Sequence, residues 1–359
     1  MTLTLPLPAE HIDDLTLEEQ RLIVRRSRTT GRARAISVSL VLTAITFVVF
    51  CISISVGDFP IPLSEVVPAV FGQGSESSDF IIHRLRLPRA LTAVLVGASF
   101  GLSGAIFQSL ARNPLASPDI IGITAGASTA AVILIVVGGA SGYIVSIGSL
   151  IGALITAVII YALAYKRGVS SYRLVLVGIG IGAVLASITS YLLTRAQIFD
   201  VQRATVWLTG SLNGRGWEHV KPVAIAMAVL VPATLALARP LRILQLGDDT
   251  AKGLGVTVER KKAGLILVGV ALAAVATAAA GPVAFVAFVA APISRRLVNA
   301  PVTLVPSALM GALLLLLSDL VARRVFAPTE LPVGIVTGII GAPYLVWLLA
   351  RSNKIGSGG

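Results

Sequence analysis

The sequence predicts an all-α, polytopic membrane protein with about ten transmembrane helices. Hydrophobic residues make up 55% of the 359-residue chain, and its mean hydropathy is +0.90. No soluble globule could hide that much apolar surface from water. The 29 lysines and arginines lie mostly in short loops between apolar runs. The net charge of +12 therefore indicates membrane topology, and no nucleic-acid partner is expected.

Residues 1–35 are polar and basic, and we expect them to form a cytoplasmic tail. A signal peptide would carry its charges nearer to the start and would offer a small-residue cleavage site. Within the tail, Leu15–Arg28 has the amphipathic pattern of a helix that lies on anionic lipid. A disordered tail that only fixes the topology fits the sequence equally well. At the other end, residues 352–359 form a short tail in which Gly356–Gly359 resembles a cloning remnant.

Residues 36–351 form the predicted membrane domain, because stretches of about 20 apolar residues can cross a bilayer core. The predicted spans are 36–56, 89–110, 119–138, 143–165, 173–194, 221–238, 262–280, 283–298, 302–322 and 332–350. The run 283–298 is short and contains Pro292, so we expect a broken helix there. With the N-terminus inside, about two thirds of the lysines and arginines fall on the inner side. Both termini are therefore predicted to be cytoplasmic.

The stretch Arg86–Ser128 reads RLPRALTAVLVGASFGLSGAIFQSLARNPLASPDIIGITAGAS and organises the rest of the chain. It holds two apolar runs that are separated by a polar hinge at residues 111–119. The first run is rich in small residues, as close helix packing in a membrane requires: Gly97, Gly101, Gly104, Ala98 and Ser103. Pro114 and Pro118 are expected to end the helix and to stiffen the hinge.

This stretch resembles the FecCD permeases, which are the membrane subunits of ABC importers for iron–siderophores, haem and vitamin B12. The resemblance covers roughly residues 84–351, and it continues in WLTGSLNGRGW, LGDDTAKGLGVTVERKK and GPVAFVAFVAAPISRRLV. The wording of these motifs is most similar to the ferric-enterobactin type. The resemblance implies a type II ABC importer permease of the cytoplasmic (inner) membrane that carries a ferric siderophore. A haem or cobalamin permease of the same fold is the alternative.

The sequence departs from the family pattern after the GPVAFVAFVAA segment. Members usually show P-H-I-A-R where this chain has Pro292-Ile293-Ser294-Arg295, so any role of that histidine is not carried over. A channel or a proton-coupled transporter is the remaining alternative. It would need a polar filter or a membrane-embedded acid–base pair, and the sequence contains neither pattern. Asp319 is the one acidic residue inside an apolar run, and we interpret it as a structural group near the outer end of its span.

No catalytic or cofactor site is expected on this chain. The G-x-x-x-x-G-K-[ST] pattern of a P-loop does not occur, so ATP is not bound in that way. The three histidines lie far apart and Cys51 is the only cysteine, so no metal site is predicted. The resemblance implies that ATP and Mg bind to a partner ATPase. The chain itself is thus expected to be a transport subunit rather than an enzyme.

Residues 241–256, LRILQLGDDTAKGLGV, form the longest predicted cytoplasmic loop between spans. Gly247 should end one short helix, and the two acids after it suit the N-terminus of a second. On the residues alone, a solvated loop with helix caps is an equally good interpretation. In FecCD permeases the matching segment forms the coupling helices that contact the ATPase. The resemblance implies that role for Leu246, Gly247, Asp248, Asp249, Thr250, Ala251, Gly253, Leu254 and Gly255.

The resemblance also implies two further sites. Arg86, Arg89 and Arg323 lie at the predicted outer ends of spans, and by residue type alone they could simply face lipid headgroups. In the vitamin B12 member of the family, arginines at these positions receive carboxylates of the extracytoplasmic binding protein, and the resemblance implies that role here. The cytoplasmic gate is expected at Asn113 and Leu115 in the hinge and at Ser171 and Tyr172, where tyrosine is larger than the small polar residue of the vitamin B12 permease.

The implied assembly contains several partners besides the lipid membrane. They are a second permease chain, with a heterodimer favoured over a homodimer, a pair of ATPase subunits and an extracytoplasmic siderophore-binding protein. The substrate is expected to pass along the interface between the two permease chains.

Overall fold

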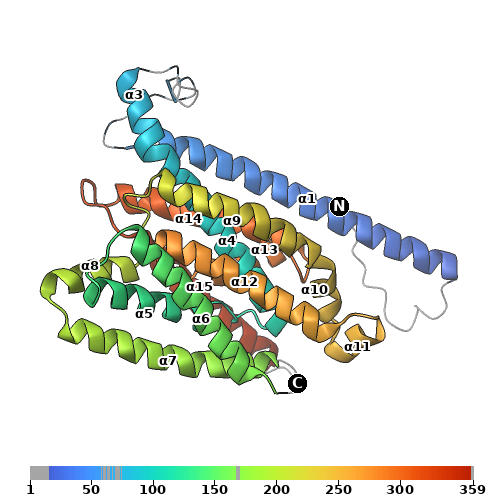
Figure 1. The fold of residues 1–359 in the computed structure, drawn as a ribbon. Coiled ribbons are helices and arrows are strands. Elements are labelled where there is room, and N and C mark those ends of the chain that lie inside the picture. The colour runs from blue at the N-terminus through green and yellow to red at the C-terminus, as the bar shows by residue number, and fades with distance from the viewer. Residues whose placement is uncertain are drawn as a thin grey trace.

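The computed structural model describes residues 16–57, 75–166 and 170–356, together with residues 59, 62, 65, 66, 68 and 73. These residues form helices that run alongside one another in a bundle, and no strand is found among them (Figure 1). The first 15 residues of the predicted tail lie outside the described residues. So do Arg167 of one predicted inner loop and residues 357–359 of the predicted remnant.

In chain order the elements are α1 Leu17–Ser55, α3 Glu76–Phe80, the π-helical turn η2 Ile81–Arg86, α4 Leu87–Ala111, α5 Ile123–Val136, α6 Tyr143–Ala164, α7 Ser171–Arg195, α8 Ile198–Leu208, α9 Trp217–Ala236, α10 Ala238–Leu244, α11 Asp248–Gly253, α12 Val258–Ala280, α13 Val286–Val298, α14 Leu304–Arg324 and α15 Val333–Gly356.

Seven of the described helices are long and apolar enough to cross a membrane, and each corresponds to a predicted span. The other three predicted spans are shorter than expected. Gly122 adopts a φ of 84° before α5, which therefore has only 14 residues instead of the predicted 119–138. α13 has 13 residues, so the span predicted at 283–298 is short as expected, but the helix continues through Pro292 and is not broken there. The apolar part of α15 covers Val333–Leu348.

The first helix is longer than the predicted span 36–56. α1 begins at Leu17 and continues to Ser55 without a break, so part of the predicted tail extends the membrane helix. Figure 1 shows α1 extending past the other helices at the end of the bundle that carries α11. Near that end, Nε of Arg34 donates a hydrogen bond of 2.8 Å to the carbonyl oxygen of Leu297, after the basic pair at the end of α13.

α4 occupies the centre of the bundle, and it packs most extensively against α14 and α12. Small residues make this possible, because glycines at the crossings bring the backbones together. A Cβ atom added to Gly101 would lie 2.1 Å from the carbonyl oxygen of Ser307 on α14. Serine hydroxyls complete the contact with α12: Ser99 Oγ donates to the carbonyl oxygen of Leu272 at 2.9 Å and Ser103 Oγ to that of Gly269 at 2.7 Å.

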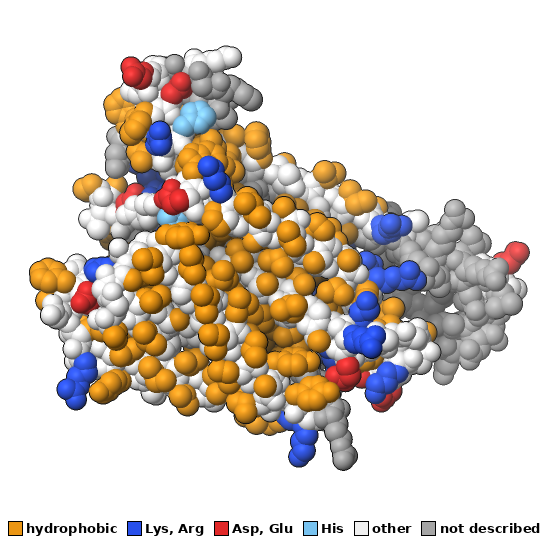
Figure 2. All heavy atoms as spheres, viewed as in Figure 1, with side chains coloured by type: hydrophobic (Ala, Val, Ile, Leu, Met, Phe, Trp, Pro, Cys, Tyr) orange, Lys and Arg blue, Asp and Glu red, His pale blue; other side chains and the backbone are white. Residues whose placement is uncertain are grey.

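Apolar side chains cover the middle of the face seen in Figure 2, and charged side chains gather toward its two ends. Lysines and arginines are concentrated near α10 and α11, as the positive-inside rule describes for the cytoplasmic end. The opposite end carries α3 and α8 (Figure 1). α10 and α11 thus mark the predicted inner end of the protein, and α3 and α8 mark the predicted outer end.

Candidate coupling, gate and docking sites

The predicted coupling segment folds as a pair of short helices, as expected. α11 begins at Asp248 directly after Gly247, whose φ of 109° is accessible to glycine at no steric cost. It ends at Gly253, and Gly255 then turns the chain with a φ of 77° toward α12. The first helix, α10, starts at residue 238, three positions before the predicted loop, and thus continues almost directly from α9.

The residues in and around α11 divide into a buried and an exposed set. Ala251 is fully buried beneath the helix, whereas Thr250 is exposed. Two large apolar side chains flank α11 and face solvent, since Leu246 is 63% exposed and Leu254 is 60% exposed. Exposed leucines beside a short polar helix give a surface that a partner protein could cover.

The two acids of α11 also differ. The Asp248 carboxylate forms ion pairs with Lys262 on α12, at 2.5 Å, and with Arg112 after α4, at 3.3 Å. The Asp249 side chain is 100% exposed, and its ion pair, at 3.6 Å, is with Lys252 of the same helix. The sequence alone could not distinguish the surroundings of Asp248 from those of Asp249. The partners of Asp248 lie on α12 and at the end of α4, outside the coupling segment.

The predicted gate residues lie in two segments at the predicted inner end, the hinge after α4 and the first turn of α7. Arg112 ends α4 in the left-handed conformation, with a φ of 49°, and the hinge then folds around Asn113. Oδ1 of Asn113 accepts a hydrogen bond of 2.9 Å from the backbone N–H of Leu115, whose side chain packs against the cluster around Phe288. Tyr172 is exposed in the first turn of α7, next to Ser171. It stays a prediction that the hinge and the start of α7 together narrow the cytoplasmic end of the substrate passage.

A polar network that the sequence did not indicate supports the hinge. Gln108 lies in the last turn of α4, where its Nε2 donates to the carbonyl oxygen of Phe288 at 2.9 Å and its Oε1 accepts from Arg295. Gln245, between α10 and α11, donates to the carbonyl oxygen of Ser109 at 2.5 Å. Single glutamines in apolar runs carry no spacing signal, so only the packing of distant helices reveals them.

The three predicted docking arginines lie near one another at the predicted outer end, and each is hydrogen-bonded within the chain. Arg89 is bound by Asp319 and by Glu330, each at 2.9 Å, and Arg323 lies 3.2 Å from Asp319. The side chains of Arg89 and Arg323 are only 12% and 9% exposed. Arg86 is buried and donates to the carbonyl oxygens of Ile54 and Ser55 at the end of α1, and to that of Phe59.

Asp319 is fully buried between Arg89 and Arg323. This agrees with its interpretation as a structural group, because a buried carboxylate needs cationic partners to stay charged. Arg323 also reaches α1, where its Nη2 donates to Ser53 Oγ at 2.6 Å. The ion network of Arg89, Asp319, Arg323 and Glu330, called here the outer network, therefore ties α4, α14 and the loop before α15 together.

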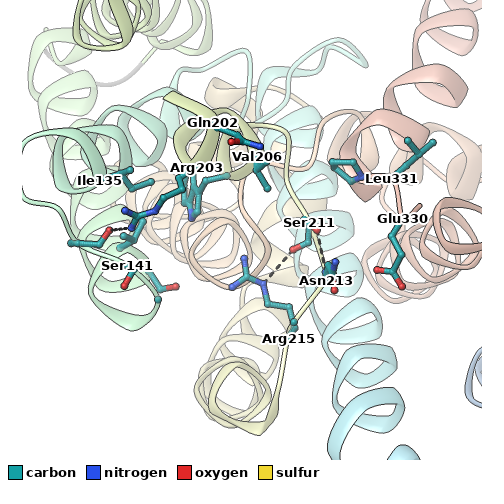
Figure 3. Close-up of a pocket in the computed structure, with 17 residues that line it drawn as sticks. Ile135, Ser141, Gln202, Arg203, Val206, Ser211, Asn213, Arg215, Glu330 and Leu331 are labelled. Atoms are coloured by element: carbon teal, nitrogen blue, oxygen red, sulfur yellow. Dashed lines mark hydrogen bonds between the residues drawn. The ribbon is translucent and has the colours of Figure 1, made fainter. Parts of the chain in front are cut away.

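A cavity of about 780 Å³ opens beside this network (Figure 3). Glu330 and Arg215 line it from two different loops, and Arg203 lines it from α8. Both arginines are already hydrogen-bonded: Arg203 Nη2 to the carbonyl oxygen of Ala140 at 2.8 Å, and Arg215 Nε to that of Ser211 at 3.2 Å. Burial lowers the pKa of Arg215, and the nearby Glu218 carboxylate opposes that shift. Segments that lie far apart in the sequence line the cavity, so no sequence motif predicted it.

These sites are built from ion pairs, a hinge and an exposed helical tip rather than from a reaction centre. Among the described residues, no group of three or more His, Cys, Asp or Glu side chains could hold a metal ion. The bundle thus combines an exposed helical tip at one end with a buried ion network at the other. That combination is suited to a transport subunit that other proteins drive.

Comparison with known proteins gives a consistent result. The model of the FecCD transport family matches residues 45–351. The chain is 39% identical to the ferric enterobactin transport system permease protein FepG of Escherichia coli (strain K12), over 89% of this chain and 98% of the relative. It is 41% identical to the probable siderophore transport system permease protein YfhA of Bacillus subtilis (strain 168), over 91% and 98%.

A solved structure also resembles this fold. It is described as an inward-facing conformation of a metal-chelate type ABC transporter, and it superposes with a TM-score of 0.79 at 28% identity. The match covers 88% of this chain and 99% of that one, so the similarity extends over the whole helical bundle.

Proposed function

This chain belongs to the FecCD transport family, and we propose from that premise that it carries a ferric siderophore across the inner membrane. It is a permease subunit of the ABC type, and it performs no covalent chemistry of its own. The observation that carries the substrate proposal is its 39% identity, over 98% of the relative, to a ferric enterobactin permease. The siderophore permease of Bacillus subtilis at 41% identity supports the same substrate class.

A separate ATPase is the proposed source of energy, with ATP and Mg bound there. The sequence lacks a P-loop, while α11 and the exposed Leu246 and Leu254 beside it offer a contact surface at the inner end. Asp249 and Thr250 face solvent on the same helix and complete the proposed surface. Movement of this helix pair would then be transmitted to the hinge at Asn113 and Leu115.

We propose that the substrate passes between this chain and a second permease chain, in a heterodimer. α7 is mostly exposed, and one of its faces combines small and hydroxyl-bearing residues at spacings of three and four: Gly180, Ala183, Ser187, Ser190 and Thr194. Lipid tails do not favour hydroxyl groups, so this face suits a polar passage or a protein neighbour better. Tyr172 lies at the inner end of the same helix.

The function is tested with the assembled transporter in liposomes, supplied with its loaded binding protein. We expect uptake of radioiron-labelled ferric enterobactin only when the liposomes contain ATP and Mg. The isolated chain should hydrolyse no ATP. Uptake of haem or cobalamin with no uptake of the ferric siderophore would refute the substrate class, and hydrolysis by the isolated chain would refute the division of labour.

Orientation and docking are tested together by labelling single cysteines in a variant that lacks Cys51. Cysteines at the exposed positions Ser77 and Asn213 should react with an impermeant thiol reagent from outside intact cells, because both lie at the proposed outer end. Cysteines at Thr250 and Asn299 should react only after the membrane is opened, since both are exposed at the proposed inner end. The reverse pattern would contradict the proposed orientation.

The cysteine that replaces Asn213 also reports docking, because a bound partner should shield it from the thiol reagent. Glu330 is 30% exposed and holds Arg89, so an incoming carboxylate has to replace it. We expect Arg89→Gln to raise the half-protecting concentration of binding protein by at least about tenfold. Glu330→Gln should lower that concentration, and Arg84→Gln, at an exposed arginine of η2, should change it little. Equal protection in all three variants would exclude Arg89 from docking.

A further inference from the structure

The two adjacent acids of α11 have different surroundings. Asp249 is fully exposed, and its ion pair is with Lys252 on its own short helix. Asp248 faces the bundle, where its Oδ2 lies 2.5 Å from Nζ of Lys262 and its Oδ1 lies 3.3 Å from Nη2 of Arg112. The Lys262 side chain is only 9% exposed. Because that ammonium group is nearly buried, its carboxylate partner matters more than in a solvated ion pair.

Asp248 thereby joins α11 to the next helix, α12, and to the end of α4, which is distant in the sequence. Lys262 belongs to the first turns of α12, and Arg112 is the residue at which α4 ends and the hinge begins. Gln245 adds a second contact between the coupling segment and α4 through the carbonyl oxygen of Ser109. A displacement of α11 is therefore transmitted by polar contacts to the end of α4 and to α12 at the same time.

The contacts continue from α4 to α13. Gln108 stands between the carbonyl oxygen of Phe288 and the guanidinium of Arg295, and it receives and donates one hydrogen bond each. Phe288 and Leu115 belong to the same apolar cluster, so the far side of the hinge rests on the element that Gln108 holds. Contacts that begin at Asp248 on α11 therefore continue through the end of α4 to α13, and they lie on both sides of the hinge.

We propose that Asp248 is a positioning residue that transmits the movement of α11 to the hinge, whereas Asp249 belongs to the surface that meets the ATPase. This inference rests on the proposed function, because a partner has to move α11. The Asp248 clasp, meaning Asp248 with Lys262 and Arg112, depends on the charge of its carboxylate. Asparagine at position 248 would keep the shape of the side chain but would leave the Lys262 ammonium without its counter-charge.

The test uses the assembled transporter with a single cysteine at Ile120, an exposed residue directly after the hinge, and with Cys51 removed. The labelling rate of this cysteine is measured with and without ATP and Mg, which requires no substrate. The second readout is the amount of ferric enterobactin taken up per ATP hydrolysed. We expect Asp248→Asn to abolish most of the ATP-dependent change in labelling and to lower the uptake ratio by about tenfold, within the range that coupling networks produce.

The matched control is Asp249→Asn, the same substitution one residue away. It should weaken retention of the ATPase during purification, but the complexes that remain should show the wild-type labelling change and uptake ratio. Asp248→Glu, which keeps the charge, should restore most of both readouts. A structural role alone would instead lower the yield of folded protein without changing the ratio.

The outcomes separate this inference from the proposed function. If wild type takes up no ferric enterobactin but its hinge responds to ATP and Asp248→Asn removes the response, the substrate proposal fails and the clasp stands. If Asp248→Asn behaves as wild type in both readouts, or if the wild-type hinge does not respond to ATP, the clasp is refuted.

Discussion

Asp319→Ala should lower the free energy of unfolding by about 3–5 kcal/mol, because it leaves two guanidinium groups without a buried counter-charge. Asp319 is fully buried, and both Arg89 and Arg323 lie within 3.2 Å of its oxygens. Arg89 would retain Glu330, whereas the hydrogen bonds left to Arg323 among the described residues would be those to the hydroxyl and carbonyl oxygens of Ser53. Unfolding of the detergent-solubilised protein, followed by heating or by denaturant, measures the loss.

Glu330→Ala is the matched control in the same network. Its carboxylate is 30% exposed, so water can replace part of the lost interaction, and we expect a loss of about 1 kcal/mol or less. The double variant Asp319→Ala/Arg323→Met should be less destabilised than the sum of the single variants, because it removes both ends of one buried pair. Equal stability of Asp319→Ala and Glu330→Ala would show that the outer network does not stabilise the fold in this way.

Gly104→Ala should be the most damaging of the conservative substitutions in α4. The new Cβ would lie 1.8 Å from the carbonyl oxygen of Ala287, which is backbone and cannot rotate away. The helices must therefore separate, and overpacking of this kind typically costs about 1–3 kcal/mol or more. The same thermal or denaturant unfolding in detergent measures it.

Gly180→Ala provides the comparison, since nothing lies within 4 Å of the Cβ that it would add on α7. A helical alanine is favoured over glycine by up to about 1 kcal/mol, so this variant should be as stable as wild type or slightly more so. If the two glycine variants unfold alike, the close approach between α4 and α13 does not limit stability.

The sequence was a good guide wherever one segment determines the outcome. Hydropathy located each of the seven described helices that are long and apolar enough to cross a membrane, because burial in lipid requires long apolar runs. The glycines and acids of residues 241–256 predicted two short helices, because the ends of helices depend on local residues. Hydropathy failed at the start of α5, where Ile120 and Ile121 are apolar but belong to a turn that Gly122 completes.

The environments of the charged residues could not be predicted, because each depends on a distant helix. Arg89 and Asp319 are 230 positions apart, and the sequence alone suggested only that arginine lies near the surface. The different surroundings of Asp248 and Asp249 likewise depend on Lys262, which lies on another helix. The cavity beside Glu330 needs loops from three parts of the chain. The spacing of residues along the sequence does not indicate which distant side chains come into contact.

The fastening of α1 has a consequence for biogenesis. The carbonyl groups of Ser53, Ile54 and Ser55 at the end of α1 are held by Arg86 and by Arg323, the latter on one of the last helices to be synthesised. Arg89 can likewise form its ion pair with Asp319 only after α14 has been synthesised. During translation the N-terminal helices must therefore enter the bilayer with guanidinium groups still lacking a carboxylate. Chains that stop before α14 would lack Asp319 and so would keep Arg89 without its buried counter-charge, which is costly within a membrane.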